Sequence, residues 1–123
     1  MKPQTWDAVL AEHDPVVAEA ARAAQSHVVA ALPGAVVQFD PGNGPLAIGT
    51  SLKMRDLLFA IIPHRAHVNL QLADGVDLPH PNGLIEAPAK RIRHVKVRSA
   101  EAATSPAIRD IVRAQIDRRR ESS

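Results

Sequence analysis

The sequence predicts an α+β fold, a two-layer sandwich in which an antiparallel sheet carries an N-terminal and a C-terminal helix on one face. Two observations predict it. Apolar residues recur at helical spacing near both ends of the chain, and between them short strand-like segments alternate with clusters of turn residues. Short turns between strands favour antiparallel pairing. With 123 residues, the chain is expected to form one domain over residues 1–123.

Each predicted long helix has a clear start signal. Residues 14–32 begin with an Asp-Pro pair, an N-cap followed by proline at the first helical position, and a Pro-Gly pair stops the helix. Residues 106–118 follow a Ser-Pro pair in the same way, and the chain after residue 118 should fray. The sequence also predicts a short helix over residues 5–12, capped by Thr5.

The middle of the chain, residues 35–72 together with 92–98, is predicted to form the sheet. Residues 67–72 alternate between apolar and polar side chains, as expected for a strand with one buried face. Residues 57–62 are apolar on both faces and predict a central strand. Residues 73–83 form the longest irregular loop. The predicted strands are 35–39, 46–49, 57–62, 67–72 and 92–98.

Composition argues against several classes of function. The chain contains no cysteine, which excludes a disulfide scaffold, a thiolate zinc site and a cysteine nucleophile. No secretory signal and no bilayer-spanning apolar run is found, so we expect a cytoplasmic protein without membrane contact. Aromatic residues make up 2% of the chain, which leaves few platforms for base stacking, so nucleic-acid binding is the weakest alternative.

Catalytic and metal-binding motifs are absent from the sequence. It has no nucleophile elbow and no phosphate-binding loop, so we expect a protein that is not an enzyme, although residues distant in sequence can converge in space. His64 and His67 are three residues apart but lie across a predicted turn, and on a strand that spacing would place them on opposite faces. Asp74, Asp77 and His80 share one loop without a supporting helix. We expect neither a native metal site nor a cofactor.

The strongest candidate site is a basic segment over residues 90–98. It holds five cations and a histidine but no carboxylate. On a strand, His94, Lys96 and Arg98 share one face while the valines between them point inward. Such a row could bind a phosphate or carboxylate group. The alternative is a solvated strand face whose charge resists edge-to-edge aggregation.

A second polar row, formed by His67, Asn69 and Gln71, occupies one face of the strand over residues 67–72. Beside the basic row it would give a cationic, hydrogen-bonding surface, and the alternative is again an ordinary solvated face. The candidate anion-binding residues are His67, Asn69, Lys90, Arg93, His94, Lys96 and Arg98.

The predicted central strand also suggests a partner. Because helices cover one face of a two-layer sandwich, either the odd-numbered or the even-numbered side chains of residues 57–62 should face outward. A homodimer through the sheet face or an edge strand would cover them. The competing explanations are that residues 1–13 fold back across the face or that a small ligand covers it.

Three segments, residues 53–61, 66–70 and the interrupted stretch 83–86 and 90–96, resemble the YdhG-like domain family of small bacterial proteins. The resemblance covers roughly residues 14–118, and its most specific parts are His-Val-Asn-Leu at 67–70 and Arg-His-Val-Lys at 93–96. It implies an α+β fold with an antiparallel sheet and flanking helices.

Some relatives in that family are described as frataxin-like iron chaperones, which makes iron handling the alternative function. An iron chaperone has ridges of acidic residues, whereas the only acidic residues in the first long helix here are Asp14 and Glu19. We therefore do not infer iron binding for this chain from the resemblance. Ala87-Pro88-Ala89 and Ile48-Gly49 also depart from the family pattern. The leading hypothesis is a non-catalytic binding module for an anionic small molecule or an acidic partner.

Overall fold

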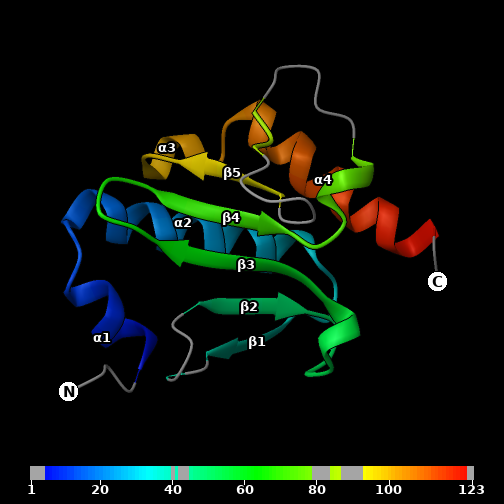
Figure 1. Ribbon diagram of the computed structural model, residues 1–123, viewed down its shortest axis with the longest axis horizontal. Coiled ribbons are helices and arrows are strands. Elements are labelled where there is room, and N and C mark those ends of the chain that lie inside the picture. Colours follow the sequence, from blue (N-terminus) through cyan, green and yellow to red (C-terminus); the bar gives the residue numbers. More distant parts are fainter. Residues whose placement is uncertain (1–4, 40, 42–44, 79–83, 87–92, 122–123) are drawn as a thin grey trace.

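The computed structural model describes residues 5–39, 41, 45–78, 84–86 and 93–121, and it has the expected α+β architecture (Figure 1). In chain order the elements are α1 (Trp6–Ala11), α2 (Pro15–Ala31), β1 (Val36–Phe39), β2 (Leu46–Gly49), the 3-10 turn η1 (Met54–Asp56), β3 (Leu57–Pro63), β4 (Val68–Leu72), the 3-10 turn η2 (Gly75–Asp77), β5 (Arg93–Val97), α3 (Ala100–Ala103) and α4 (Pro106–Glu121). The sequence signals miss the one-turn helix α3, which starts at the N-cap Ser99.

The start and stop signals of α2 work as the sequence predicts. The Asp14 side chain accepts a hydrogen bond of 2.9 Å from the Val16 N–H, and Pro15 occupies the first helical position. Beyond the helix, Gly34 adopts a φ of 72°, a left-handed conformation that favours glycine. Side chains at helical spacing then bury one face of α2 against the sheet: Val17, Ala20, Ala21, Ala24 and Val28.

The five strands form an antiparallel meander in the order β1-β2-β3-β4-β5. β3 is therefore the central strand, as the doubly apolar run predicts. Beyond β5, Glu86 pairs with His94 through two backbone hydrogen bonds of 2.7 and 3.0 Å. Neighbouring antiparallel strands need only short connections, which explains why turn residues separate the strand-like segments in the sequence.

A β-bulge in β3 decides which side chains face outward. β2 pairs regularly with β3 up to Ile48, and Gly49 then pairs with Leu57, so Leu58 is an extra residue in β3. Leu58 and the following Phe59 are both buried in the core, with 1% and 2% exposure. The outward set therefore follows neither of the two alternating patterns that the sequence predicts. The outward residues of β3 are Leu57, Ala60 and Ile62.

The long helices lie on one face of the sheet, as predicted, and β3 and β4 pass in front of α2 in Figure 1. The face toward the viewer carries none of the helices among the described residues, and we call it the outer face. The apolar core lies between the two layers. The sheet contributes to it Leu46, Ile48, Phe59, Ile61, Val68, Leu70, Leu72, Val95 and Val97, and α4 contributes Ile108, Ile111, Val112 and Ile116.

The helix α1 also lies on the helical side of the sheet. Trp6 donates a hydrogen bond of 3.0 Å from Nε1 to Oε1 of Gln25 in α2, and its ring centroid lies 6.0 Å from that of Phe39. Leu10 is 1% exposed within the core. The proposal that residues 1–13 cover the outer face is therefore wrong for residues 5–13, because their apolar side chains already pack against α2 and β1.

A partly buried polar cluster, which we call the latch, joins α4 to the end of β4. It consists of Asp74, Gln115 and Arg119. The fully buried Gln115 accepts a hydrogen bond of 2.8 Å from the Asp74 N–H and donates one of 2.7 Å to the Asp74 carboxylate. Arg119 donates to the same carboxylate at 3.0 Å and to the carbonyl groups of Arg55 and Leu57 at 2.9 and 3.1 Å.

The latch corrects the expected end of the C-terminal helix. The helix continues to Glu121 rather than fraying after residue 118. Its last turn is held because hydrogen bonds of the latch join Arg119 to two distant stretches of the chain, residues 55–57 and Asp74. Arg118 adds an ion pair of 3.4 Å with Asp77.

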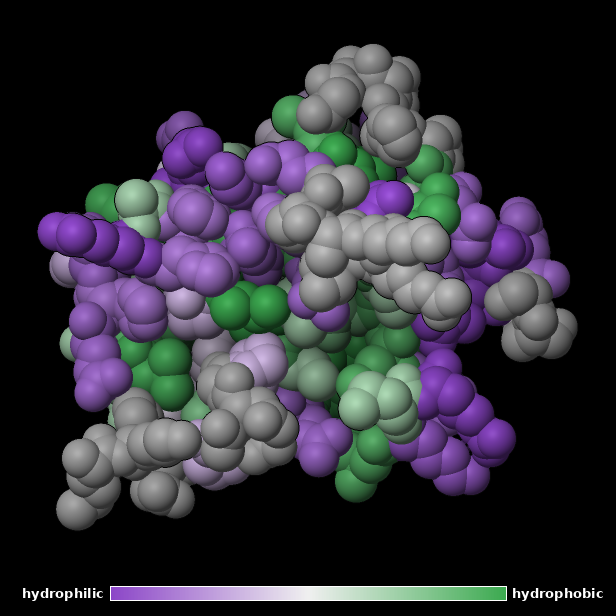
Figure 2. All heavy atoms as spheres, viewed as in Figure 1, coloured by the Kyte–Doolittle hydropathy of each residue, from purple (hydrophilic) through white to green (hydrophobic). Residues whose placement is uncertain are grey.

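The outer face divides into a polar and an apolar half. Figure 2 shows hydrophilic residues over the left-hand ends of β4 and β5, and hydrophobic residues toward the centre and lower right. The apolar side includes the outward side chains of β3 and two strongly exposed residues of the preceding segment, Leu52 at 64% and Met54 at 82%. Within the described residues, no helix is long and apolar enough to cross a membrane.

Candidate functional site

The pairing of β4 with β5 brings most of the sequence-predicted site residues onto the outer face. Asn69 pairs with Lys96 and Gln71 pairs with His94, while the valines that alternate with them in β5 are buried. His67 comes just before β4 and Arg98 just after β5, at the same end of the sheet. We call this set the outer-face row: His67, Asn69, Gln71, His94, Lys96 and Arg98.

Two predicted residues do not join the row. Arg93 alternates with His94, and a β-carbon added to Gly75 of η2 would lie 2.3 Å from the Arg93 β-carbon, so Arg93 packs toward η2 on the opposite face. Including Arg93 in the row is therefore wrong, because strand alternation separates it from Lys96. Lys90 lies outside the described residues.

His94 is the most buried member of the row, with 7% exposure. Burial lowers its pKa, and the nearby positive charge of Lys96 and the His64 ring lower it further, whereas the Glu86 carboxylate opposes them. Glu86 also forms an ion pair of 3.4 Å with Lys96. The strand pairing beyond β5 therefore places a carboxylate beside the row and offsets part of its charge.

His64 and His67 come together in a way the sequence spacing does not predict. Their rings stack with centroids 5.0 Å apart, because the chain reverses at this point and the His64 N–H donates 2.8 Å to the His67 carbonyl. Burial, followed by the charges of His64, Lys96 and Arg98, lowers the pKa of His67, while the Asn69 side chain raises it. The strand rule of opposite faces does not apply to this pair, because the two histidines lie across the turn that the sequence predicts at residues 63–65.

Asn69 sits at the centre of this group. Its Nδ2 lies 3.1 Å from Nε2 of His64. Its Oδ1 is buried and makes no hydrogen bond of normal geometry with the described residues. An acceptor in this condition is an attachment point for a donor on a partner or for a water molecule.

The row is mainly a hydrogen-bonding surface with positive charge at one end. Lowered pKa values keep His67 and His94 neutral near pH 7. Arg98 is exposed and makes no ion pair with the described residues, and Arg65 is exposed in the turn between β3 and β4. A sheet face is broad and flat, so this arrangement suits an extended surface better than an enclosed small molecule.

The two aspartates of the loop that follows β4 bind residues of α4 rather than a metal ion. Asp74 bonds to Gln115 and Arg119, and Asp77 pairs with Arg118, whereas His80 lies outside the described residues. In the part of the chain that the structure describes, no group of three or more His, Asp or Glu side chains is arranged to hold a metal ion.

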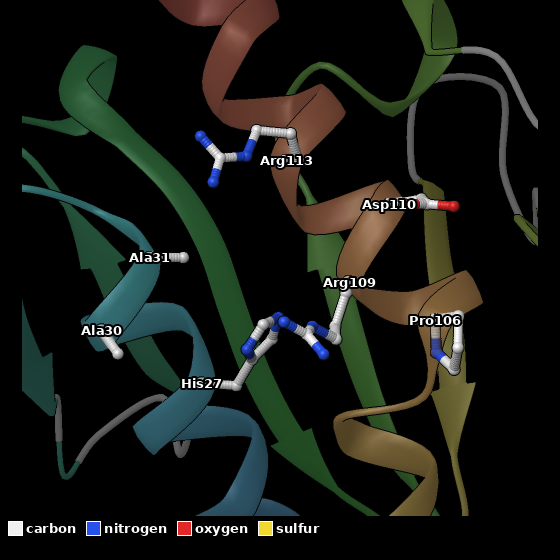
Figure 3. Close-up of a pocket in the computed structure, with 7 residues that line it drawn as sticks. All are labelled: His27, Ala30, Ala31, Pro106, Arg109, Asp110 and Arg113. Carbon is white, nitrogen blue, oxygen red and sulfur yellow. The ribbon is translucent and has the colours of Figure 1, made fainter.

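A second candidate site, which the sequence reasoning missed, is a groove of about 560 Å³ between α2 and α4 (Figure 3). The signal that could have found it is the i, i+4 spacing of Arg109 and Arg113, which places both on one face of the C-terminal helix. The position of the helix pair could not be predicted. α2 contributes His27, Ala30 and Ala31, and α4 contributes Pro106, Arg109, Asp110 and Arg113.

Comparison with protein-family models, with curated proteins and with solved structures finds no match for this chain. Fold and site define it as a two-layer α+β protein in which no described helix covers the outer face, and that face carries a histidine-rich and partly cationic row.

Proposed function

We propose that the protein is a non-catalytic binding module whose outer-face row docks an acidic partner. The observation that carries the proposal is the register of β4 and β5, which gathers Asn69, His94 and Lys96 on the outer face. Neutral histidines and amides supply hydrogen bonds, and Lys96 and Arg98 supply the charge that attracts a carboxylate-rich surface.

The shape of the outer face favours a macromolecular partner over a small molecule. The polar row borders the apolar strip of Leu57, Ala60 and Ile62, and a hollow of about 160 Å³ beside Leu57 and Gln71 joins the two halves. Apolar area beside polar groups is the usual composition of a protein interface. An acidic peptide or protein can use both halves, whereas a small anion would contact only the row.

Fluorescence anisotropy with a labelled hexaglutamate peptide tests this proposal. We expect binding at about 50 mM salt that weakens steeply as salt screens the charges. The double variant Lys96→Ala/Arg98→Ala should bind about tenfold more weakly, as the loss of two interface charges implies. Arg22→Ala, which removes an exposed arginine of α2 that pairs with Asp7, is the matched control and should bind normally. Equal affinity of the double variant and the control would refute the proposal.

A homodimer through the outer face is the second candidate. It is favoured by one observation: α1 packs on the helical side and leaves the apolar strip of β3 without cover among the described residues. Light scattering across micromolar to millimolar concentration tests it, with Ile62→Lys as the variant that should abolish self-association. A monomer at all concentrations, before and after the substitution, would remove the dimer.

The YdhG-like resemblance and the cytoplasmic location are parts of the same proposal. The resemblance is carried by His67–Leu70 and Arg93–Lys96, two segments that pair side by side in β4 and β5. The frataxin-like iron-handling alternative has no supporting observation in the described residues. Anaerobic titration with ferrous iron tests it, and binding no tighter than that of an unrelated protein of similar charge would remove it.

A further inference from the structure

We propose that the groove between α2 and α4 is a separate binding site for a small phosphomonoester. The groove lies in the helical layer, on the opposite side of the sheet from the outer-face row, so this inference does not rest on the proposed acidic partner. Its volume, about 560 Å³, is in the range of small-molecule sites.

The positive charge of the groove comes from two arginines. Arg109 and Arg113 lie one turn apart on α4, both exposed, and neither side chain makes a hydrogen bond or ion pair with the described residues. Figure 3 shows the Arg109 guanidinium beside the His27 ring and Arg113 extending from α4 toward α2. The lining carboxylate, Asp110, points away from His27 in the same view. Guanidinium groups on one wall can hold phosphate oxygens by paired hydrogen bonds.

His27 supplies a second, independent sign of a ligand. Its Nε2 atom is buried and has no hydrogen-bond partner among the described residues. Burial, followed by the charge of Arg109, lowers the pKa of His27, so the ring is neutral near pH 7. A neutral ring with the proton on Nε2 donates one hydrogen bond, and an anion oxygen between His27 and Arg109 would accept it.

The helix ends orient the ligand. Pro106 begins α4, whose amino end is electropositive, whereas α2 ends at Ala31, so its electronegative carboxyl end lies on this side of the groove. The anion therefore belongs at the His27–Arg109 end. The methyl groups of Ala30 and Ala31 form the wall beyond it, which fits a compact organic group. Two guanidinium charges match a phosphate dianion better than a monovalent carboxylate.

Titration of the full chain, followed by amide chemical shifts, tests the site with three probes: phenyl phosphate, inorganic phosphate and benzoate. We expect saturable binding of phenyl phosphate, weaker binding of inorganic phosphate, which lacks the organic group, and binding of benzoate weaker by about tenfold. The shifts should centre on residues of α2 and α4 that line the groove. Shifts centred on β4 and β5 would overturn this site while supporting the outer-face row.

Variants separate the site from a general charge effect. Arg109→Gln/Arg113→Gln should lose at least about tenfold in affinity for phenyl phosphate, because charge-assisted hydrogen bonds are removed. His27→Phe should also weaken binding, because it removes the ring donor. Arg22→Gln, an exposed arginine of α2 paired with Asp7, is the matched control. All four positions involved are at least partly exposed, so folding should persist, as circular dichroism can verify. Absence of saturation up to about 10 mM phenyl phosphate, or equal affinity of the double variant and the control, would overturn the proposal.

Discussion

The latch and the outer-face row both contain an amide side chain with buried polar atoms. Within the described residues, the hydrogen-bonding atoms of the amide are all paired only in the latch. In the latch, both polar ends of Gln115 are paired with Asp74, and Arg119 reaches two backbone carbonyls as well. In the row, the Asn69 carbonyl oxygen is buried without a well-formed hydrogen bond in the described part of the chain. Asn69 lies near the start of β4, whereas Asp74 of the latch follows its end.

The difference separates polar groups that stabilise the fold from polar groups that are available for binding. Burial alone would raise the pKa of Asp74, but hydrogen bonds from Arg119 and Gln115 and the charges of Arg119 and Arg118 lower it overall. In His67 and His94, burial is not compensated in this way, and the rings are kept neutral. A satisfied cluster contributes stability, whereas an incompletely satisfied one favours a partner that completes it.

Removing the central amide of the latch should have the largest effect on stability. Gln115→Leu leaves the Asp74 N–H and carboxylate without their buried partner, so we expect the free energy of unfolding to fall by about 2–3 kcal/mol. Urea denaturation measures the change. Gln38→Leu, at an exposed position of β1, is the control and should change stability by less than about 0.5 kcal/mol. A Gln115→Leu protein as stable as this control would show that the latch is not structural.

Substitution of Gly49, which pairs with β3 at the bulge, should reduce stability almost as much as the change in the latch. A β-carbon at Gly49 would lie 2.2 Å from the Asp56 carbonyl oxygen and 2.8 Å from the Leu57 α-carbon, both of them backbone atoms. Gly49→Ala should therefore cost about 2 kcal/mol, because the strands must separate locally. Thermal unfolding checks this, and Gly34→Asn is the control, since a β-carbon there meets nothing within 4 Å and Asn tolerates a left-handed backbone. A Gly49→Ala midpoint equal to that of the control would argue against a tight bulge.

Lowering the pH should reduce the free energy of unfolding, because three histidines have lowered pKa values in the folded protein. Lowered pKa values mean that His27, His67 and His94 take up protons at lower pH in the folded state than in the unfolded chain, whose ordinary value is 6.5. The unfolded chain then binds more protons, so stability is complete above pH 6.5 and is lost as pH falls from there toward the folded values. Unfolding measured at several pH values should show this slope.

The double variant His67→Asn/His94→Asn should flatten that slope while leaving the contribution of His27. If the slope is unchanged in the variant, the row does not hold its histidines neutral, and the difference between the row and the latch would lose its electrostatic part.

The smallest effect should come from replacing the amide of the row. Asn69→Leu removes a buried acceptor that lacks a good partner and gives up one contact with His64. The first effect stabilises the protein and the second destabilises it. We therefore expect the free energy of unfolding to change by less than about 1 kcal/mol, in contrast to the same kind of replacement at Gln115. The comparison uses identical urea conditions. A loss as large as that of Gln115→Leu would show that the two regions are equally structural.

Local signals carried most of the architecture and part of the site. The Asp-Pro and Ser-Pro starts predicted α2 and α4, and alternation predicted that His94 and Lys96 share a face opposite the valines of β5. These features depend on neighbours within a few residues, so the sequence contains the whole cause. Alternation also places Arg93 and Lys96 on opposite faces of β5. The predicted anion-binding set, which includes both residues, is therefore wrong at Arg93.

What only the tertiary structure decided involves groups distant in the chain. By itself, the sequence determined the two long helices, the strands and the inward faces of β4 and β5, because helical and strand periodicity are local properties. It could not place Gln115 against Asp74, bring His27 opposite Arg109, or shift the pairing of Gly49 past Leu58. These pairings depend on how the two layers pack, since contacts between residues tens of positions apart are fixed by the shared core rather than by local pattern.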